Sequence, residues 1–110
     1  MGRSIDEAKK GSAEIVILAI VEHESHHGYE IAKLIERRTE GGLRFTLASL
    51  YATLYRLEDR GWIDAEWGIS PEGRKAKFYR LTVEGRRQLN AETETWRVFS
   101  LAVNHVLRAT

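Results

Sequence analysis

The sequence predicts a mainly α-helical domain that carries one small β-hairpin and ends in a long helix. Three observations indicate this fold class. In the first half of the chain, one uninterrupted apolar run is followed by two segments with apolar residues at helical spacing. Apolar and polar residues then alternate on both sides of a turn that contains the single proline, Pro71. Helical spacing then returns toward the end of the chain. With 110 residues, 43% hydrophobic and 30% charged, the chain can form one domain with a modest core.

The first predicted helix contains residues 15–21, which are apolar without interruption. Ser12 is its expected N-cap, and Glu14 lies near its first turn. A helix that is apolar on every face is covered on most sides, by its own domain and by a further partner. Because the run is rich in β-branched residues, a buried strand remains the alternative.

The second and third helices are predicted at residues 29–38 and 47–60. The glycines at 41–42 end the second helix. Thr46 is the expected N-cap of the third helix, and Gly61 follows its end at a position that favours a left-handed glycine. The buried stripe of the third helix is formed by Leu50, Leu54 and Leu57.

Residues 62–67 and 75–81 alternate apolar and polar side chains around a turn at 69–73, which predicts a two-stranded hairpin. Thr82 is the expected cap of a final helix that reaches about residue 107. Three helices followed by a hairpin form the layout of a winged helix–turn–helix domain. In that layout the third helix enters the major groove of DNA and the hairpin is the wing.

We therefore predict a DNA-binding domain at residues 1–82 and a dimerisation helix at residues 83–110. Apolar residues of that last helix fall on one seam with seven-residue repeats: Leu89, Trp96, Phe99, Val103 and Val106. A terminal amphipathic helix can also fold back onto its own domain, but a chain of this length offers little other surface to cover. We expect a homodimer.

The face of the third helix opposite the leucine stripe is suited to a DNA groove. It carries small residues that permit close approach, together with the polar groups of Ser49, Tyr51 and Arg56. Ser49 and Tyr51 can bond phosphate, Ser49 can also bond a base edge, and Arg56 can bind guanine or phosphate. The alternatives are a solvated helix face and, for Tyr51, a packing role.

Residues 72–80 form the densest cluster of charge, with four cations against one carboxylate. Arg74, Lys75 and Lys77 belong to it, and Lys75 and Lys77 share one face of the hairpin. A basic wing suits contact with the DNA backbone, whereas lysines on a hairpin edge can also serve only to prevent aggregation. Together with the third helix, the cluster favours DNA binding, although the net charge is only +1.

Several classes of function are excluded. The absence of cysteine excludes disulfides, zinc ribbons and a Cys nucleophile, and no phosphate loop or hydrolase motif is present, so we expect no catalytic residue, no metal and no cofactor. The spacing of His23, His26 and His27 matches no established metal site, and we expect them in a solvated loop. The polar N-terminal residues are unlike a signal peptide, and the longest apolar run is far below the roughly 20 residues that span a bilayer, so we expect a cytoplasmic protein.

Motifs in chain order resemble one known family. They are GYEI at 28–31, SLYATLYRLEDRG at 49–61, EWG at 66–68, GR at 73–74 and YRLTVEG at 79–85. With them the chain resembles the PadR family of bacterial transcription regulators over nearly its whole length. Family members often have proline after SLY, where this chain has Ala52. Because alanine is a good helix former, we expect an unchanged fold, with any effect confined to how the first turn meets DNA.

The resemblance implies a dimeric repressor with one short C-terminal helix per subunit, which binds inverted-repeat operators, often near transporter or detoxification genes. It implies DNA contacts from Ser49, Tyr51, Arg74, Lys75 and Lys77, whereas Arg56 comes from the helical wheel alone. In some relatives a tryptophan of the last helix lines a pocket for aromatic ligands, so Trp96 is a candidate for binding a small-molecule effector; a buried place in the dimer core is the simpler interpretation. The competing hypothesis is a winged-helix module that binds protein and not DNA.

Overall fold

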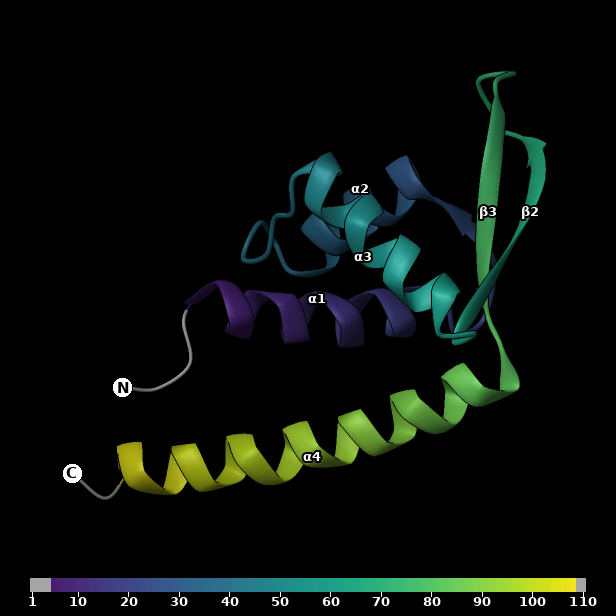
Figure 1. Ribbon diagram of the computed structural model, residues 1–110. Helices are drawn as coiled ribbons and strands as arrows, with labels where there is room; N and C mark the ends of the chain where they lie inside the picture. The colour runs from purple at the N-terminus through teal and green to yellow at the C-terminus, as the bar shows by residue number, and fades with distance from the viewer. Residues whose placement is uncertain (1–4, 109–110) are drawn as a thin grey trace.

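The computed structural model of the protein describes residues 5–108. In chain order the elements are α1 (Ile5–Ile20), β1 (His26–His27), α2 (Gly28–Arg38), α3 (Leu47–Asp59), β2 (Ile63–Ile69), β3 (Lys75–Leu81) and α4 (Val83–Arg108). Figure 1 shows α2 and α3 on one side of α1, α4 on its other side, and the β2–β3 hairpin standing at one end. The predicted fold class, a winged helix–turn–helix with a long C-terminal helix, is confirmed.

Helix α1 begins at Ile5, so Ser12 lies inside the helix and the predicted N-cap is wrong. The sequence before Ser12 has acidic residues near the helix start, followed by alanine and lysines. These residue types favour a helix there, and it therefore starts earlier than the apolar run. Of the two alternatives for residues 15–21, the helix is the one observed, and Ile17 and Leu18 are fully buried in the core.

Helix α2 ends at Arg38, slightly before the two glycines predicted as its stop. The amide of Gly41 donates to the carbonyl oxygen of Glu36 at 2.8 Å. The amide of Glu40 donates to the carbonyl oxygen of Arg37 at 3.1 Å. Glu40, with φ of 52°, takes the left-handed position that glycine usually occupies at such a helix end.

The predicted boundaries of α3 are confirmed to within one residue. Its N-cap is Thr46, whose hydroxyl accepts a hydrogen bond from the Ser49 amide at 3.1 Å. Gly61 follows the C-cap with φ of 78°, a conformation that costs glycine little. The leucine stripe is buried as predicted: Leu50, Leu54 and Leu57.

The predicted hairpin forms from β2 and β3, and a third strand, β1, was not predicted. Strand β1 pairs His26 with Tyr79 and His27 with Phe78, which gives the strand order β1–β3–β2. A polar strand of two residues has no alternation that the sequence could reveal, because its pairing depends on β3. The consequence is that the start of α2 is held directly against the wing.

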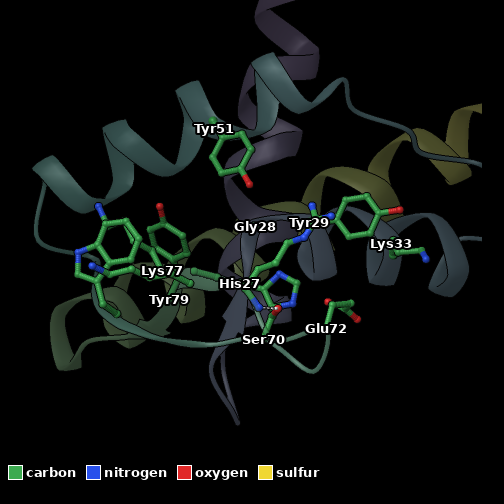
Figure 2. A pocket seen from close by; sticks show the side chains of 13 residues that line it. His27, Gly28, Tyr29, Lys33, Tyr51, Ser70, Glu72, Lys77 and Tyr79 are labelled. Carbon is green, nitrogen blue, oxygen red and sulfur yellow. Dashed lines mark hydrogen bonds between the residues drawn. The ribbon is translucent and has the colours of Figure 1, made fainter.

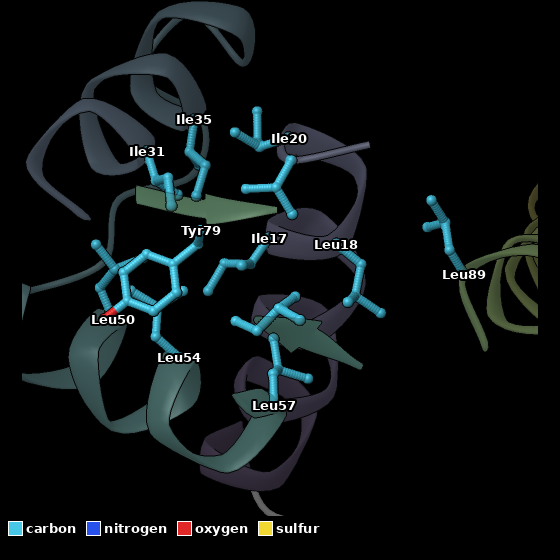
Figure 3. Close-up of a cluster of buried hydrophobic side chains, with 12 residues drawn as sticks. Ile17, Leu18, Ile20, Ile31, Ile35, Leu50, Leu54, Leu57, Tyr79 and Leu89 are labelled. Carbon is cyan, nitrogen blue, oxygen red and sulfur yellow. The ribbon is translucent and has the colours of Figure 1, made fainter. Parts of the chain in front are cut away.

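Helix α4 begins as predicted, with the Thr82 hydroxyl accepting from the Gly85 amide at 2.9 Å. A Cβ atom at Gly85 would lie 1.9 Å from the carbonyl oxygen of Trp62, so this close approach requires glycine. Leu89 then joins the core that α1, α2, α3 and the wing strands form (Figure 3). No described residue of α4 beyond Leu89 is buried, and the longest dimension of the molecule reaches 54 Å.

Candidate nucleic-acid interface

The face of α3 that points away from the core is exposed along its whole length. Ser49 lies on its first turn, and Tyr55 is 72% exposed. Ala48 and Ala52 are exposed on the same face and have short side chains. Small side chains at the centre of an exposed helix allow a groove to approach the backbone closely. The structure thus places Ser49 where it was predicted, on the solvent-facing side.

Tyr51 is both partly exposed and packed against a neighbouring element. Its side chain is 47% exposed, yet its ring lies against the first residue of α2. A Cβ atom at Gly28 would be 2.6 Å from the ring and from the hydroxyl oxygen of Tyr51. Gly28 therefore provides the space in which the ring lies, and Figure 2 shows the hydroxyl pointing away from α3 toward the start of α2.

Arg56 does not lie on the exposed face, which corrects the position predicted from the helical wheel. Its guanidinium turns toward α1, where Nε lies 3.6 Å from a carboxylate oxygen of Glu14, and Nη2 donates to the Thr53 hydroxyl at 3.1 Å. The side chain is 29% exposed. The wheel gave the angle of the Cα–Cβ bond, but a long side chain follows its charge partner, which belongs to another helix.

The cations of the wing fall into two groups. Arg74 and Lys75 are exposed near the tip, and Lys75 Nζ lies 5.3 Å from the centre of the Trp67 ring. Lys77 lies nearer the base of the wing and forms an ion pair with Glu58 of α3 at 3.3 Å. Within the described residues, ion pairs therefore engage Lys77 and leave the charges of Arg74 and Lys75 at the tip uncompensated.

An open cleft of about 830 Å³ separates the wing from the start of α2 and from α3. Its walls combine cations with aromatic rings, and Figure 2 shows them gathered from the three elements. The charged lining residues are Lys33, Arg74, Lys75 and Lys77, with Glu72 as the only carboxylate among them; the rings are those of His27, Tyr29, Tyr51, Trp67 and Tyr79. Burial raises the pKa of the Tyr79 phenol above its ordinary value, so this ring stays uncharged and the cations set the sign of the cleft.

The contribution of α2 to this cleft was not predicted. Tyr29 of α2 is 53% exposed, and Lys33 Nζ lies 5.1 Å from its ring centre. Because β1 pairs with β3 and α2 begins directly after it, the first turn of α2 lies beside the wing. The GYEI motif was the available signal, because its glycine and tyrosine are both cleft residues.

Two of the three clustered histidines are buried, contrary to the expected solvated loop. The Nδ1 atom of His27 accepts a hydrogen bond from the Glu30 amide at 3.3 Å and so caps α2. His26 Nδ1 lies 2.8 Å from a carboxylate oxygen of the same glutamate. These contacts give both histidines a structural role, and the described residues contain no group of three or more side chains arranged to hold a metal ion.

The distal half of α4 presents the opposite chemistry. Trp96 is 55% exposed, Phe99 58%, Val103 37% and Val106 70%, and the Trp96 and Phe99 rings lie 6.2 Å apart. Leu89, which was assigned to the same seam, is instead buried in the core of its own chain. An apolar face of this size on a single helix is unusual for a monomer.

The structure has an exposed third helix, a β-hairpin wing and a basic cleft between them. This arrangement is typical of winged helix–turn–helix proteins that bind nucleic acid. The chain belongs to the PadR-like family of transcriptional regulators, whose family model matches residues 17–91. No helix within residues 5–108 is both long and apolar enough to cross a membrane.

The chain is also similar to a curated protein and to solved structures. A curated, uncharacterised protein of Lysinibacillus sphaericus is 33% identical over 87 residues, which cover 79% of this chain and 80% of that protein. A solved transcriptional regulator from Clostridium thermocellum has 27% identity and a TM-score of 0.80, covering 94% of this chain and 97% of its own. A PadR-like transcriptional regulator from Bacillus cereus has 29% identity and a TM-score of 0.79, covering 92% and 96%.

Proposed function

We propose that this protein is a transcriptional repressor that binds double-stranded DNA as a homodimer at an inverted-repeat operator. One observation carries the proposal: Tyr51 of α3 and the unpaired cations of the wing, Arg74 and Lys75, line the same basic cleft. Solubility alone does not require cations and aromatic rings to cluster beside an exposed helix, whereas contact with nucleic acid does.

In this proposal α3 enters the major groove and the wing lies along the adjacent backbone. Ser49 reaches a base edge or a phosphate from the first turn of α3, and the Tyr51 hydroxyl bonds phosphate from the cleft. Arg74 and Lys75 neutralise phosphates at the wing tip, and Lys77 joins them only by leaving Glu58. Arg56 is not among the proposed contacts, because its charge is directed at α1.

The proposed dimer is supported by the apolar face of α4. Two copies of this face bury each other if α4 pairs around a two-fold axis, and a two-fold dimer presents its recognition helices to an inverted repeat. The seam then consists of Trp96, Phe99, Val103 and Val106. Leu89 stabilises the attachment of α4 to its own domain and does not join the seam.

The alternative to a place of Trp96 in the seam is that it binds a small-molecule effector. If the dimer leaves a gap at its centre, a planar aromatic effector can stack on the indole ring and change the distance between the two domains. Planar aromatic cations should then quench the tryptophan fluorescence of the wild type, and this quenching should disappear in Trp96→Ala. If Trp96 instead packs the dimer core, no quenching occurs and the variant dissociates.

A protein-binding module is the alternative, and a salt titration separates it from DNA binding. Binding of a random 30-base-pair duplex should weaken steeply with salt, with a log–log slope of about −0.9 for each phosphate contact. A duplex selected by the protein from a random library should bind more tightly than the random duplex at the same salt concentration. No binding to either duplex at low salt would contradict the proposal and favour a protein partner.

A further inference from the structure

One carboxylate of α1 holds two arginines that belong to the recognition helix and its cap. Arg60 Nη1 donates to Glu14 Oε1 at 2.9 Å, and Arg56 Nε lies 3.6 Å from Glu14 Oε2. The Glu14 side chain is only 20% exposed, so water screens these attractions less than it screens an ordinary surface ion pair. Neither Glu14 nor either arginine lines the cleft.

The two arginines are tied to their surroundings in different ways. The Arg60 guanidinium also lies over the Trp62 ring at 4.9 Å. Arg56 donates to the Thr53 hydroxyl through Nη2, while its buried Nε makes no hydrogen bond within the described residues. Electrostatic attraction to Glu14 is therefore what compensates the buried donor of Arg56.

The position of α1 gives this cluster its importance. Figure 1 shows α1 between α3 on one side and α4 on the other, and α1 packs against both. The path from the proposed dimer helix to the proposed DNA-reading helix therefore crosses α1. Among the α1 side chains from Ser12 onward, Glu14 is the one whose charge is directed across that path at α3.

We infer that Glu14 is a positioning residue that fixes the orientation of α3 relative to the α1–α4 pair. The inference rests on the proposed function, because orientation matters only when a dimer must place two recognition helices on one duplex. When both recognition helices are already held in the correct orientation, binding to two half-sites loses little conformational entropy. The affinity is then higher although no new contact forms. A single half-site needs only one recognition helix, which docks in whatever orientation it has.

Glu14→Gln tests the inference because it keeps the shape of the side chain and removes its charge. The probes are a duplex selected from a random library by the wild type and the same duplex with one half scrambled. The variant should bind the full duplex about tenfold more weakly and the half duplex within about twofold of the wild type. Its melting temperature should fall by about 4 °C or more, which a merely structural role would also produce, so the ratio of the two affinities is the decisive readout.

Two further variants keep the test decisive. Arg60→Gln removes the charged donor of the 2.9 Å hydrogen bond to Glu14. It should lower the ratio of full-duplex to half-duplex affinity by a smaller factor than Glu14→Gln does. Glu84→Gln is the control, because Glu84 pairs at 2.8 Å with Arg87 of the same helix, α4, and not with a residue of α1 or α3. It should leave the ratio unchanged.

Three results would overturn the inference. One is an unchanged ratio in Glu14→Gln, and another is an equal loss on the full and half duplexes. The third is the same loss of ratio in Glu84→Gln, because a general loss of stability would then explain it. A wild type that selects no sequence would instead defeat the proposed function, and the inference with it.

Discussion

The two ends of the molecule leave different chemistry exposed. At the wing end, cations and aromatic rings surround an open cleft, and Arg74 and Lys75 have no ion-pair partner within the described residues. At the far end of α4, exposed side chains are apolar, with Trp96 and Phe99 both more than half exposed. Unpaired cations attract a polyanion and apolar surface packs against another apolar surface, so the two ends should bind different partners.

The largest expected effect is at the apolar end. Trp96→Ala should weaken the dimer by about 3–5 kcal/mol for each indole ring that dimerisation buries. Sedimentation should show a shift toward monomer at micromolar concentration. Affinity for the selected duplex should fall, while thermal unfolding of the domain itself should change little because Trp96 lies outside the core. A variant that stays dimeric would remove Trp96 from the seam.

The converse variant acts only at the cleft. Arg74→Ala combined with Lys75→Ala should lower the salt slope by about 0.9 for each phosphate that is no longer neutralised, or about 3–4 for a dimer, on selected and random duplexes alike. Sedimentation should still show a dimer. Arg87→Ala, which removes an exposed cation at the start of α4, should keep the wild-type slope. If the double variant also keeps it, the wing does not contact the backbone.

A smaller effect is expected from the floor of the cleft. Gly28→Ala places a methyl group where the Tyr51 ring lies, so the ring must move. The free energy of unfolding should change by less than about 1 kcal/mol, because alanine favours the helix while the displaced ring packs less closely. Affinity for DNA should fall several-fold. In a Tyr51→Ala background the same substitution should have no further effect on DNA binding, and an additive loss would show that the ring is not the cause.

The smallest effect concerns the ion pair between the wing and α3. Glu58→Gln releases Lys77, which can then neutralise a phosphate, so the salt slope should become steeper by at most about 0.9 per subunit. Random duplex should bind slightly more tightly. The gain should vanish when Lys77 is also replaced by alanine. A gain that persists in the double variant would come from the removal of the negative charge alone.

The sequence predicted the elements better than it predicted where long side chains point. The caps at Thr46 and Thr82 and the glycine at position 61 are local signals, because each acts within a few residues of the chain, and the structure bears all of them out. The start of α1 was missed because the apolar run marks what is buried and not where the helix begins.

The errors in the candidate site depend on tertiary contacts. Arg56 was placed on the exposed face because its partner, Glu14, lies 42 positions away in the sequence on another helix. Leu89 fits the heptad spacing of the seam but is buried in the core of its own domain. Tyr29 is exposed at the start of α2, which follows the two-residue strand that pairs with the wing. None of these placements follows from spacing alone, since each depends on which surfaces meet.

The most direct test of the account is hydroxyl-radical footprinting of the selected duplex by the wild type and by Trp96→Ala. The wild type should protect two stretches on one face of the DNA, with centres about 34–36 Å apart, because a dimer joined through α4 presents two α3 helices. Trp96→Ala should protect each stretch only at higher protein concentration and without cooperativity. A single protected stretch with the wild type, or two stretches that are still protected cooperatively in Trp96→Ala, would contradict the account. In that account the cleft contacts DNA and α4 forms the dimer.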